Sequence, residues 1–348
     1  MATRIAILGA GLIGREHIAL VLRHPSTELA AIVDPSDDAR RLAADVNVPH
    51  YTDTVAMLDE VKPDGVVIAL PNALHIPAAM NCVERGISCL VEKPIADTVE
   101  AAKELVEASV RLNVPVLIGH QRRYSPDIQM AKRAIDEGRL GRLVAVHGMW
   151  LADKPEKYFD AEWRRKPGGG PLLINLIHDI DCLRYICGDI ESVRAFSSNA
   201  VRGFEVADTA SVSLRFGNGA LGTLLMSDAV VSPYNWDTAS GQALYFPHQP
   251  ENCYYLGGTK GLLAAPTMDL WYHPNQDGSW QDPLARQHLT LDGSRAYDNQ
   301  LDHFLAVIDR QASPLISAED GMKTLATVLA IDIAAREDRT VNISELVS

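Results

Sequence analysis

Short apolar runs alternate with stretches of helical periodicity through the first 123 residues. The apolar runs lie at 5–8, 29–33, 65–70, 87–91 and 114–118. They lack the polar–apolar alternation of a half-exposed strand, which is typical of strands buried on both faces of a parallel sheet. Strands and helices in this order predict an α/β fold, with a doubly wound parallel sheet over residues 1–123.

After Tyr124 the pattern changes to longer strand-like segments. A helix is expected from about Pro126 to Glu137, and two closing helices are expected near the C-terminal end. The strand-like segments lie at 142–151, 190–197, 209–216 and 220–228, and the closing helices at about 299–311 and 318–336. Gly217-Asn218-Gly219 is a hairpin signal between the last two strands. We therefore expect a second, α+β domain over 124–348, with a large, mostly antiparallel open sheet.

Composition narrows the class of protein. Hydrophobic residues make up 47% and charged residues 22% of the 348 positions, the profile of a globular chain long enough for two domains. The net charge of −13 disfavours nucleic acid as a partner. No apolar stretch is long enough to span a membrane, and a strand follows the N-terminus so closely that we expect no signal peptide. Five cysteines without a C-x-x-C pair favour reduced thiols, a cytoplasmic protein and no metal site.

A glycine-rich turn follows the first predicted strand. Gly9, Gly11 and Gly14 form G-x-G-x-x-G, with Leu12 and Ile13 opening the helix that follows. In this strand–turn–helix context the glycines allow a tight turn and close approach of the backbone to a pyrophosphate. The helix N-terminus then faces the phosphate charge. The motif predicts a Rossmann domain that binds NAD or NADP.

An acid at the end of the second predicted strand bears on the choice of cofactor. Asp34 lies at the position where such domains hydrogen-bond the adenosine ribose, and its charge would repel a 2′-phosphate. This favours NAD over NADP. Ser36, Arg40 and Arg41 lie nearby and could hold a phosphate instead. Asp34 could also serve as a turn residue or helix cap.

Other polar residues follow the ends of the predicted strands. They are Asn72 and His75 after 65–70, Glu92 and Lys93 after 87–91, and Gln121 after the last strand of the domain. Ligands of open α/β sheets bind at the carboxyl ends of the strands, so all five are candidates for contact with the cofactor. The alternatives are helix caps for Asn72 and His75, and a surface lysine beside a turn proline for Lys93.

The second half contains one unusual local composition. Trp163 and Arg164 lead through a basic stretch into Gly168-Gly169-Gly170. A largely apolar helix is expected over 171–185, with His178 and Asp181 three residues apart and therefore on one face. A histidine on such a helix is either a core residue or a catalytic one.

The order and spacing of four motifs resemble the glucose-fructose oxidoreductase / inositol dehydrogenase / MocA family. They are Gly9-x-Gly11-x-x-Gly14, Pro71-Asn72-x-x-His75, Glu92-Lys93-Pro94 and Gly119-x-x-Arg122-Arg123. The resemblance implies that Lys93 lies beside the nicotinamide and contacts the reacting oxygen. It also implies that His178, in the family's H-x-x-D motif, meets that lysine across the inter-domain cleft. One face of the second sheet would mediate assembly, as a homodimer or homotetramer.

One departure from the family affects the substrate side. Many sugar dehydrogenases of this family carry an acid four residues before the histidine, and this chain has Ile174 there. Asn175 is the nearest polar residue, and an amide can bind or orient a hydroxyl but cannot take a proton from it. Further candidates for substrate contact are Arg122, Tyr124, Trp163 and Arg164. An aromatic-rich segment at 232–255 either suits a sugar or cyclic polyol, or forms an oligomer contact or a β-bulged edge.

These features predict an NAD(P)-dependent dehydrogenase that oxidises a secondary alcohol of a sugar, sugar acid or cyclic polyol. His178 would take the hydroxyl proton as general base, Asp181 would orient it, and Lys93 would stabilise the oxygen as charge develops. The alternatives within the family are a ketone or imine reductase, a cis-dihydrodiol dehydrogenase and an NAD-dependent enzyme that cleaves glycosides. A non-catalytic dinucleotide sensor is the alternative of another class.

Overall fold

The computed structural model describes residues 2–243, 245–275 and 278–347. The chain folds into two compact units. Unit 1 comprises Met1–Gln121 and Tyr297–Leu325, and unit 2 comprises Arg122–Ala296 and Ala326–Ser348. The sequence analysis had assigned all of 124–348 to the second domain. The segment 297–325 instead clusters with unit 1, because residues such as Ile308 and Ser317 contact its sheet.

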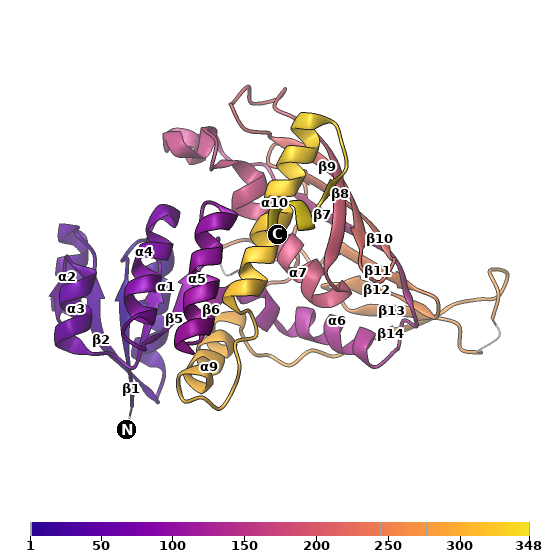
Figure 1. The fold of residues 1–348 in the computed structure, drawn as a ribbon. Helices are drawn as coiled ribbons and strands as arrows, with labels where there is room; N and C mark the ends of the chain where they lie inside the picture. Colours follow the sequence, from indigo (N-terminus) through magenta and orange to yellow (C-terminus); the bar gives the residue numbers. More distant parts are fainter. Residues whose placement is uncertain (1, 244, 276–277, 348) are drawn as a thin grey trace. The chain divides into compact units, whose positions relative to one another are not determined.

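Unit 1 contains a parallel six-stranded sheet in the order β3-β2-β1-β4-β5-β6 (Figure 1). Its strands are β1 (Thr3–Leu8), β2 (Thr27–Val33), β3 (His50–Tyr51), β4 (Gly65–Ile68), β5 (Ser88–Glu92) and β6 (Val116–Gly119). Their apolar residues are buried, as expected for strands covered on both faces. The order reverses direction at β1, which confirms the expected doubly wound sheet.

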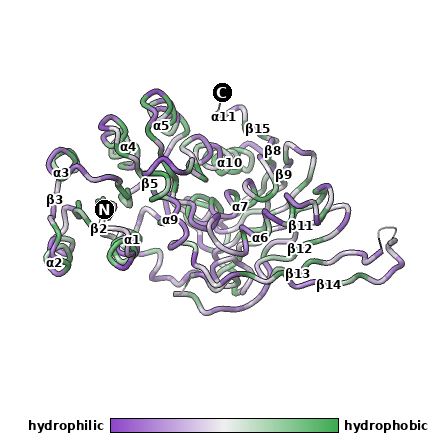
Figure 2. The backbone as a smooth tube through the Cα atoms, turned by 90° about the horizontal axis from the view of Figure 1, so that it is seen from below, coloured by the Kyte–Doolittle hydropathy of each residue, from purple (hydrophilic) through white to green (hydrophobic). Residues whose placement is uncertain are grey.

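The helices of unit 1 are amphipathic. They are α1 (Leu12–Arg23), α2 (Asp37–Asp45), α3 (Thr54–Val61), α4 (His75–Val83), α5 (Val99–Leu112) and α9 (Ala296–Ile308), of which Ala296 belongs to unit 2. Helix α5, for example, buries Val99, Ala102, Leu105 and Ala108, which recur every three to four residues. Hydrophobic and hydrophilic stretches accordingly alternate along these helices in Figure 2.

Unit 2 contains a nine-stranded sheet in the order β14-β13-β12-β11-β7-β10-β9-β8-β15. The strands are β7 (Leu143–Leu151), β8 (Ile190–Ser198), β9 (Thr209–Phe216), β10 (Leu221–Ser227), β11 (Tyr254–Gly258), β12 (Gly261–Ala265), β13 (Asp269–Tyr272), β14 (Ala285–His288) and β15 (Val341–Asn342). Of the pairs between them, β7 and β10 are parallel and the others are antiparallel. The expected mostly antiparallel sheet is confirmed, while strands β11 to β15 were not predicted.

Unit 2 also contains helices, three of which contact strands of this sheet. The helices are α6 (Pro126–Asp136), α7 (Ile177–Cys187), α8 (Trp236–Ala239), α10 (Ala318–Glu337), whose first eight residues belong to unit 1, and α11 (Ser344–Val347). Short helical turns are η1 (Asn72–Leu74), η2 (Gln121–Tyr124), η3 (Glu156–Asp160), η4 (Glu162–Arg165) and η5 (Leu172–Leu176). Helices α6 and α7 contact each other within unit 2.

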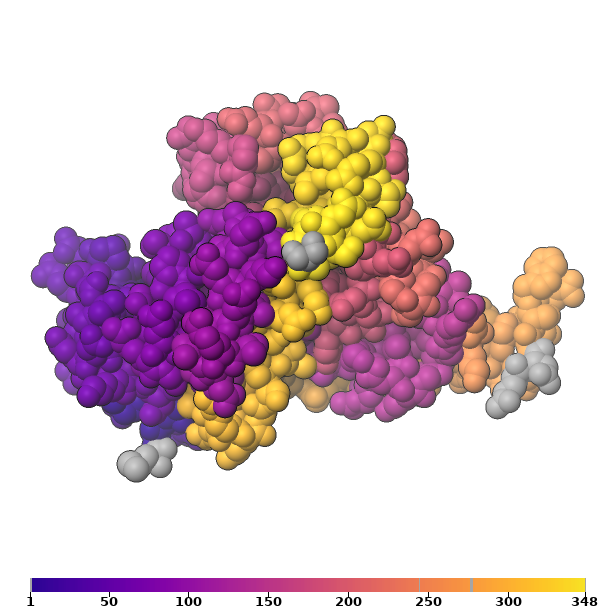
Figure 3. Space-filling model, viewed as in Figure 1, coloured from indigo at the N-terminus to yellow at the C-terminus, as the bar shows by residue number. Residues whose placement is uncertain are grey.

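The surface of unit 2 includes the segment between β13 and β14. Its described residues, 273–275 and 278–284, are coloured orange in Figure 3, and Trp280 among them is 92% exposed. Trp280 is therefore not part of a packed core. Among the described residues, no helix is both long and apolar enough to cross a membrane.

Candidate active site

The glycine-rich turn between β1 and α1 is closely packed on one side and open on the other. Gly9 has a φ of +90°, and a Cβ there would lie 2.3 Å from a carbonyl oxygen just after β4. A Cβ on Gly14 would lie 1.9 Å from the carbonyl oxygen of Gly9. Apart from the two chain neighbours of Gly11, no described residue comes within 4 Å of a Cβ built on that glycine. The N–H groups that open α1, from Leu12 and Ile13 on, are therefore a suitable site for a pyrophosphate.

Asp34 follows β2 and is held by two main-chain groups. Its Oδ2 accepts a hydrogen bond from the Ala10 N–H at 2.8 Å, and its Oδ1 accepts one from the Ser36 N–H at 2.8 Å. Partial burial opposes ionisation, but the hydrogen bonds from Ser36 and Ala10 outweigh it and lower the pKa of Asp34. A carboxylate fixed beside the glycine turn still has lone pairs for ribose hydroxyls. This arrangement fits NAD.

The two arginines near Asp34 have partners on their own helix. Arg40 lies 2.8 Å from Asp37, and Arg41 pairs with Asp38, each one turn earlier on α2. These acids reduce the positive charge that a 2′-phosphate would meet, although both pairs are exposed and therefore weak. The arrangement of α2 thus also favours NAD over NADP.

His75 ties two loops of the carboxyl edge together. It is 1% exposed, its Nδ1 lies 2.8 Å from the Pro94 carbonyl oxygen, and its Nε2 lies 2.8 Å from the Leu70 carbonyl oxygen. The sequence analysis had proposed direct contact with the cofactor. With both ring nitrogens on the main chain, His75 instead positions the loop after β5 relative to the end of β4. Asn72, at the start of η1, is partly exposed.

The loop after β5 carries Glu92 and Lys93. Glu92 is buried, and its Oε1 lies 2.8 Å from His17 Nε2 on α1. Burial opposes ionisation of Glu92, but the contact with His17 and the charge of Lys93 lower the pKa of this carboxyl. Lys93 is partly exposed and is followed by a cis bond to Pro94. The glutamate thus connects the strand end to α1, and the lysine is the member of the pair with an accessible side chain.

The helix with His178 contains a π-turn close to its start. Residues Leu172–Leu176 form η5, and the regular α7 starts at Ile177. The helix that the sequence analysis predicted over 171–185 is confirmed, while the π-turn within it was not foreseen. A π-turn adds a residue to one turn and is often found at functional sites. Here it places Asn175 just before His178, which is 8% exposed.

Asp181 has a partner other than His178. Its Oδ2 accepts from Arg123 Nε and its Oδ1 accepts from Arg123 Nη2, both at 2.7 Å. The aspartate is 1% and the arginine 3% exposed, so this is a buried two-pronged ion pair. Both carboxylate oxygens are directed at the guanidinium group. Asp181 therefore anchors α7 to η2. That it also orients the imidazole of His178, as the sequence analysis suggested, stays a prediction.

Arg122 is also buried rather than exposed to substrate. Its Nη2 donates to both oxygens of Asp237 at 2.9 and 3.0 Å, and its Nη1 lies 3.5 Å from Asp179 Oδ2. The guanidinium carbon lies 4.7 Å from the ring centroid of Trp236, and Tyr254 donates its O–H to Asp179. Two aromatic residues of the segment 232–255 thus complete a buried charge cluster, where the sequence analysis had expected them to face a sugar.

The remaining expected substrate contacts differ in exposure. Tyr124 is 5% exposed, and burial raises its pKa. Trp163 is 52% exposed, and Arg164 stacks at 4.0 Å on the ring of Tyr158. Gln121 is partly exposed at the start of η2. Trp163 and Arg164 therefore lie next to each other in unit 2, with Trp163 exposed, whereas Tyr124 is buried in the core of that unit.

Lys154 is a polar residue of this region that the sequence analysis missed. Its Nζ lies 2.6 Å from Asn175 Oδ1 and 3.8 Å from Asp228 Oδ2. It also lies 4.5 Å from the ring centroid of Tyr158 and 5.4 Å from that of Trp150. The sequence feature that could have identified Lys154 is its position shortly after a strand end, among aromatic residues.

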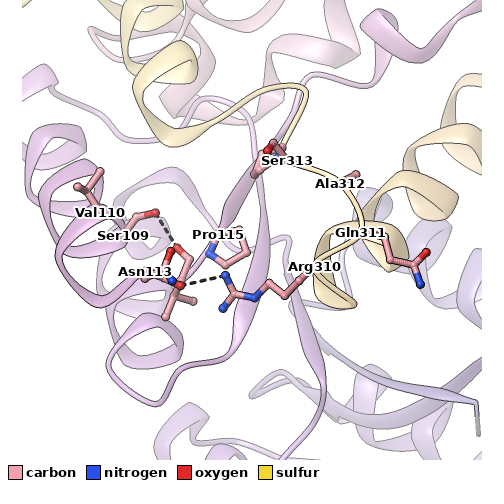
Figure 4. A pocket seen from close by; sticks show the side chains of 10 residues that line it. Ser109, Val110, Asn113, Pro115, Arg310, Gln311, Ala312 and Ser313 are labelled. Carbon is pink, nitrogen blue, oxygen red and sulfur yellow. Dashed lines mark hydrogen bonds between the residues drawn. The ribbon is translucent and has the colours of Figure 1, made fainter.

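A separate cavity of about 530 Å³ lies at the amino end of β6, in unit 1 (Figure 4). It lies between the turn 113–115 and the loop 310–314, and Arg310 Nη1 donates to the Asn113 carbonyl oxygen at 2.9 Å. The glycine turn and Lys93 lie at the carboxyl ends of their strands, which is the opposite edge of the sheet. This cavity is therefore distinct from the expected cofactor site.

The cysteines are buried and carry no disulfide. All five are free, and burial raises the pKa of the thiols of Cys182, Cys187 and Cys253. Raised pKa values keep these thiols protonated and unreactive. Within the part of the chain that the structure describes, no group of three or more His, Cys, Asp or Glu side chains could hold a metal ion.

Two models of one protein family match most of the chain. The NAD-binding Rossmann-fold model of the GFO/IDH/MocA oxidoreductase family matches residues 3–120, and the model of the GFO/IDH/MocA C-terminal domain matches residues 128–264. The 1,5-anhydro-D-fructose reductase of Ensifer adhaerens is 28% identical over 342 residues, covering 95% of this chain and 96% of that protein.

Two more distant relatives also match over nearly their whole length. The 2,7-anhydro-N-acetylneuraminate hydratase of Escherichia coli is 24% identical, covering 98% of this chain and 97% of that protein. The WlbA dehydrogenase of Bordetella pertussis, solved with NADH and UDP-GlcNAcA, has a TM-score of 0.79 at 24% identity, covering 98% of this chain and 99% of that one. The structural likeness shows a shared fold.

The buried cluster around Arg122 predicts a pH dependence of stability. Burial raises the pKa of Asp179 from 3.8 to about 6, despite the attraction of Arg122. The folded chain therefore keeps a proton that the unfolded chain releases between these values. The free energy of unfolding should fall as pH rises through that window, by up to about 3 kcal/mol. In Asp179→Asn this group no longer titrates, so the fall should be smaller.

Urea unfolding between about pH 4 and pH 7 measures this difference. Asp332→Asn, an exposed acid on α10 that pairs with Arg336, is the control and should keep the wild-type slope. Identical slopes in the wild type and Asp179→Asn would contradict the raised pKa.

Proposed function

This chain belongs to the GFO/IDH/MocA family of oxidoreductases, and on that basis we propose that it oxidises a secondary alcohol of a sugar, sugar acid or cyclic polyol. The family match confirms the expected class, an NAD(P)-dependent oxidoreductase, over a non-catalytic sensor. The observation that carries the proposal is that Lys93 is the accessible residue of a loop held from both sides, by His75 and by the His17–Glu92 pair.

The residues of unit 1 fit NAD in three respects. The open side of Gly11 leaves room for a pyrophosphate at the start of α1. Asp34 offers a fixed carboxylate for the ribose hydroxyls. Asn72 and Gln121 are partly exposed after their strands and are further contacts in this proposal. When bound, NAD supplies the hydride acceptor at nicotinamide C4.

The chain's own residues would then accept the proton of the substrate hydroxyl and stabilise its oxygen. His178 takes the proton from the substrate hydroxyl as general base. Lys93 donates a charge-assisted hydrogen bond to the same oxygen and stabilises the charge that develops there. In this division of roles unit 1 binds the cofactor and unit 2 supplies the base and the substrate contacts, among them Asn175, Trp163 and Arg164.

An oxidation followed by elimination is the second candidate. The similarity to a 2,7-anhydro-N-acetylneuraminate hydratase favours it. The same lysine and histidine suffice, because an oxidised carbon lowers the pKa of its neighbouring C–H. Release of free sugar from a glycoside without net formation of NADH distinguishes this candidate from simple dehydrogenation.

Assembly through the sheet of unit 2 is also part of the proposal. Register places Trp271, Leu262 and Leu221 in one row across the sheet, and Leu225 and Phe196 in another. All five are exposed, between 37% and 67%. An exposed apolar face of this kind supports a homodimer or homotetramer. The five free thiols support a reducing, cytoplasmic location.

Replacement of the proposed catalytic residues tests the mechanism. Lys93→Ala and His178→Ala should each lower turnover at least ~100-fold, the scale of lost acid–base or electrostatic help. NADH absorbance with a panel of sugars, inositols and sugar acids is the measurement. Lys62→Ala and His24→Ala, two side chains that precede the amino ends of β4 and β2, at the edge of the sheet opposite to Lys93, should keep wild-type rates. A near-normal rate in either catalytic variant would contradict the mechanism.

Replacement of Asp34 tests the choice of cofactor. Asp34→Ala should weaken NAD binding about 10- to 100-fold, the scale of lost hydrogen bonds to a charged group. It should also reduce the ratio by which the protein binds NAD more tightly than NADP. Fluorescence titration with both reduced cofactors measures the two dissociation constants. Asp45→Ala, an exposed acid at the end of α2, is the matched control. Tighter binding of NADP by the wild type would contradict the assignment.

Charge placed on the sheet face tests the assembly. Leu221→Glu combined with Leu225→Glu should convert the oligomer to a monomer, because a buried interface disfavours unpaired carboxylates. Light scattering after size exclusion gives the mass. Val110→Glu, an exposed apolar residue on α5, should leave the mass unchanged. A monomeric wild-type protein would refute the proposed interface.

A further inference from the structure

Glu92 joins helix α1 to the main chain of Lys93. Its Oε1 lies 2.8 Å from His17 Nε2, and its Oε2 accepts a hydrogen bond from the Lys93 N–H at 3.3 Å. Burial opposes ionisation of Glu92, but the contacts with His17 and Lys93 outweigh it and lower the pKa of this carboxyl. A carboxylate can only accept hydrogen bonds, so His17 Nε2 carries a proton and is the donor.

His17 lies on the helix that begins at the glycine-rich turn. Helix α1 starts at Leu12, so His17 lies about 8 Å along the helix axis from the N–H groups at the proposed pyrophosphate site. The histidine is buried, and Gly14, which packs against the Gly9 carbonyl oxygen, lies three residues before it. One helical segment therefore connects the pyrophosphate site to the contact with Glu92.

The carboxylate of Glu92 has little room to move. A Cβ on Gly119, at the end of β6, would lie 3.0 Å from Glu92 Cα, Cδ and Oε1. On the other side of the contact, the ring of Tyr297 meets the ring of His17 edge-on, with centroids 5.9 Å apart. The carboxylate thus occupies the space that a side chain at 119 would need, which gives this motif glycine a structural reason. A shift of His17 would be passed through Glu92 to the N–H of Lys93.

We propose that His17 is a positioning residue for the reaction. Through Glu92 it fixes the main chain of Lys93 relative to the start of α1, and hence relative to the phosphates of a bound dinucleotide. The same buried contact thereby sets the point from which the Lys93 side chain reaches the reacting oxygen. The inference rests on the proposed function, because that function gives Lys93 its role. It deepens that function by assigning a residue of α1 that acts through another residue.

Replacement of His17 tests the positioning by separating turnover from cofactor binding. His17→Leu removes the donor and should lower kcat about 10- to 100-fold, the scale of a displacement of about 1 Å at a reacting group. The dissociation constant of NADH should stay within the same order of magnitude, because the glycine-rich turn and Asp34 are unchanged. His17→Gln should restore most of the turnover, since its amide N–H can donate to the carboxylate. Equal kcat in the wild type and His17→Leu, measured with the best substrate of the panel, overturns the proposal.

A second histidine on the same helix provides the matched control. His24 follows the last residue of α1, and its Nε2 lies 3.0 Å from Asp302 Oδ1 on α9. His24→Leu therefore removes a histidine–carboxylate contact at the opposite end of α1. It should lower thermal stability and leave kcat unchanged. An equal loss of kcat in His17→Leu and His24→Leu would mean that α1 is only destabilised, which overturns the positioning role.

Combination with Lys93→Ala shows whether His17 acts through the lysine. In the Lys93→Ala background, His17→Leu should cause no further loss of kcat, because its effect requires the lysine side chain. If the two losses multiply as independent effects do, His17 acts by another route and the proposal is overturned.

Hydrogen exchange of the Lys93 amide tests the link without turnover. This N–H donates to Glu92 Oε2, so its exchange relative to the amides of β5 reports how firmly the carboxylate is held. Exchange should be faster in His17→Leu than in the wild type, and His17→Gln should restore most of the protection. Mass spectrometry of the full-length protein, with electron-transfer fragmentation to resolve single amides, is the measurement. Wild-type exchange at Lys93 in His17→Leu overturns the proposal.

These outcomes separate the inference from the proposed function. If Lys93→Ala is inactive while His17→Leu keeps wild-type kcat and wild-type exchange, the mechanism stands and the inference fails. If Lys93→Ala keeps its turnover, the mechanism fails, and the exchange rate alone decides whether His17 positions the chain at Lys93.

Discussion

Buried charge in unit 2 has to be paired, and the pairs present determine how the helix with His178 is held. Arg122 and Arg123 follow Gln121 directly in the chain, and both guanidinium groups are buried. Asp237 accepts both hydrogen bonds of Arg122, and the acids on α7 that face the two arginines are Asp179 and Asp181, one and three residues after the histidine. Removal of one partner of a buried pair leaves an uncompensated charge, at a cost of about 3–5 kcal/mol. The pairs therefore join η2 and α7 into one part of unit 2, and the position of His178 follows from that of the arginines.

A similar arrangement supports Lys93 in unit 1. Glu92 contacts His17 on α1, and His75 connects the Pro94 and Leu70 carbonyl oxygens. Four residues that the motifs suggested as functional, namely Glu92, His75, Arg122 and Asp181, are buried and occupied with such contacts. They position the chain around the two residues that we propose to act on the substrate. A motif can thus be a signature of function because it holds the site, with only some members touching the ligands.

The fold could be predicted where the signal is local. Apolar runs identified β1, β2 and β4 to β6, because strands covered on both faces need continuous apolar residues. Strands β11 to β15 escaped prediction, since short segments such as Asp269–Tyr272 mix polar and apolar residues and form strands only through their neighbours. The π-turn at Leu172–Leu176 was also missed, because its residues have the same apolar pattern as an ordinary helix.

The same distinction applies to the site. By itself the sequence determined the edge of unit 1 at which we propose that the cofactor binds. The local geometry of Gly9, Gly11, Gly14 and Asp34 depends on a turn and on strand ends that short stretches encode. Only the tertiary structure decided which charges are buried and with what partner. Arg123 and Asp181 are 58 residues apart, and Arg122 and Asp237 are 115 apart. Lys154 and Asn175, which hydrogen-bond to each other, are likewise 21 apart. Pairing of this kind depends on the folded path of the chain, because burial makes each charge require a partner without specifying which one.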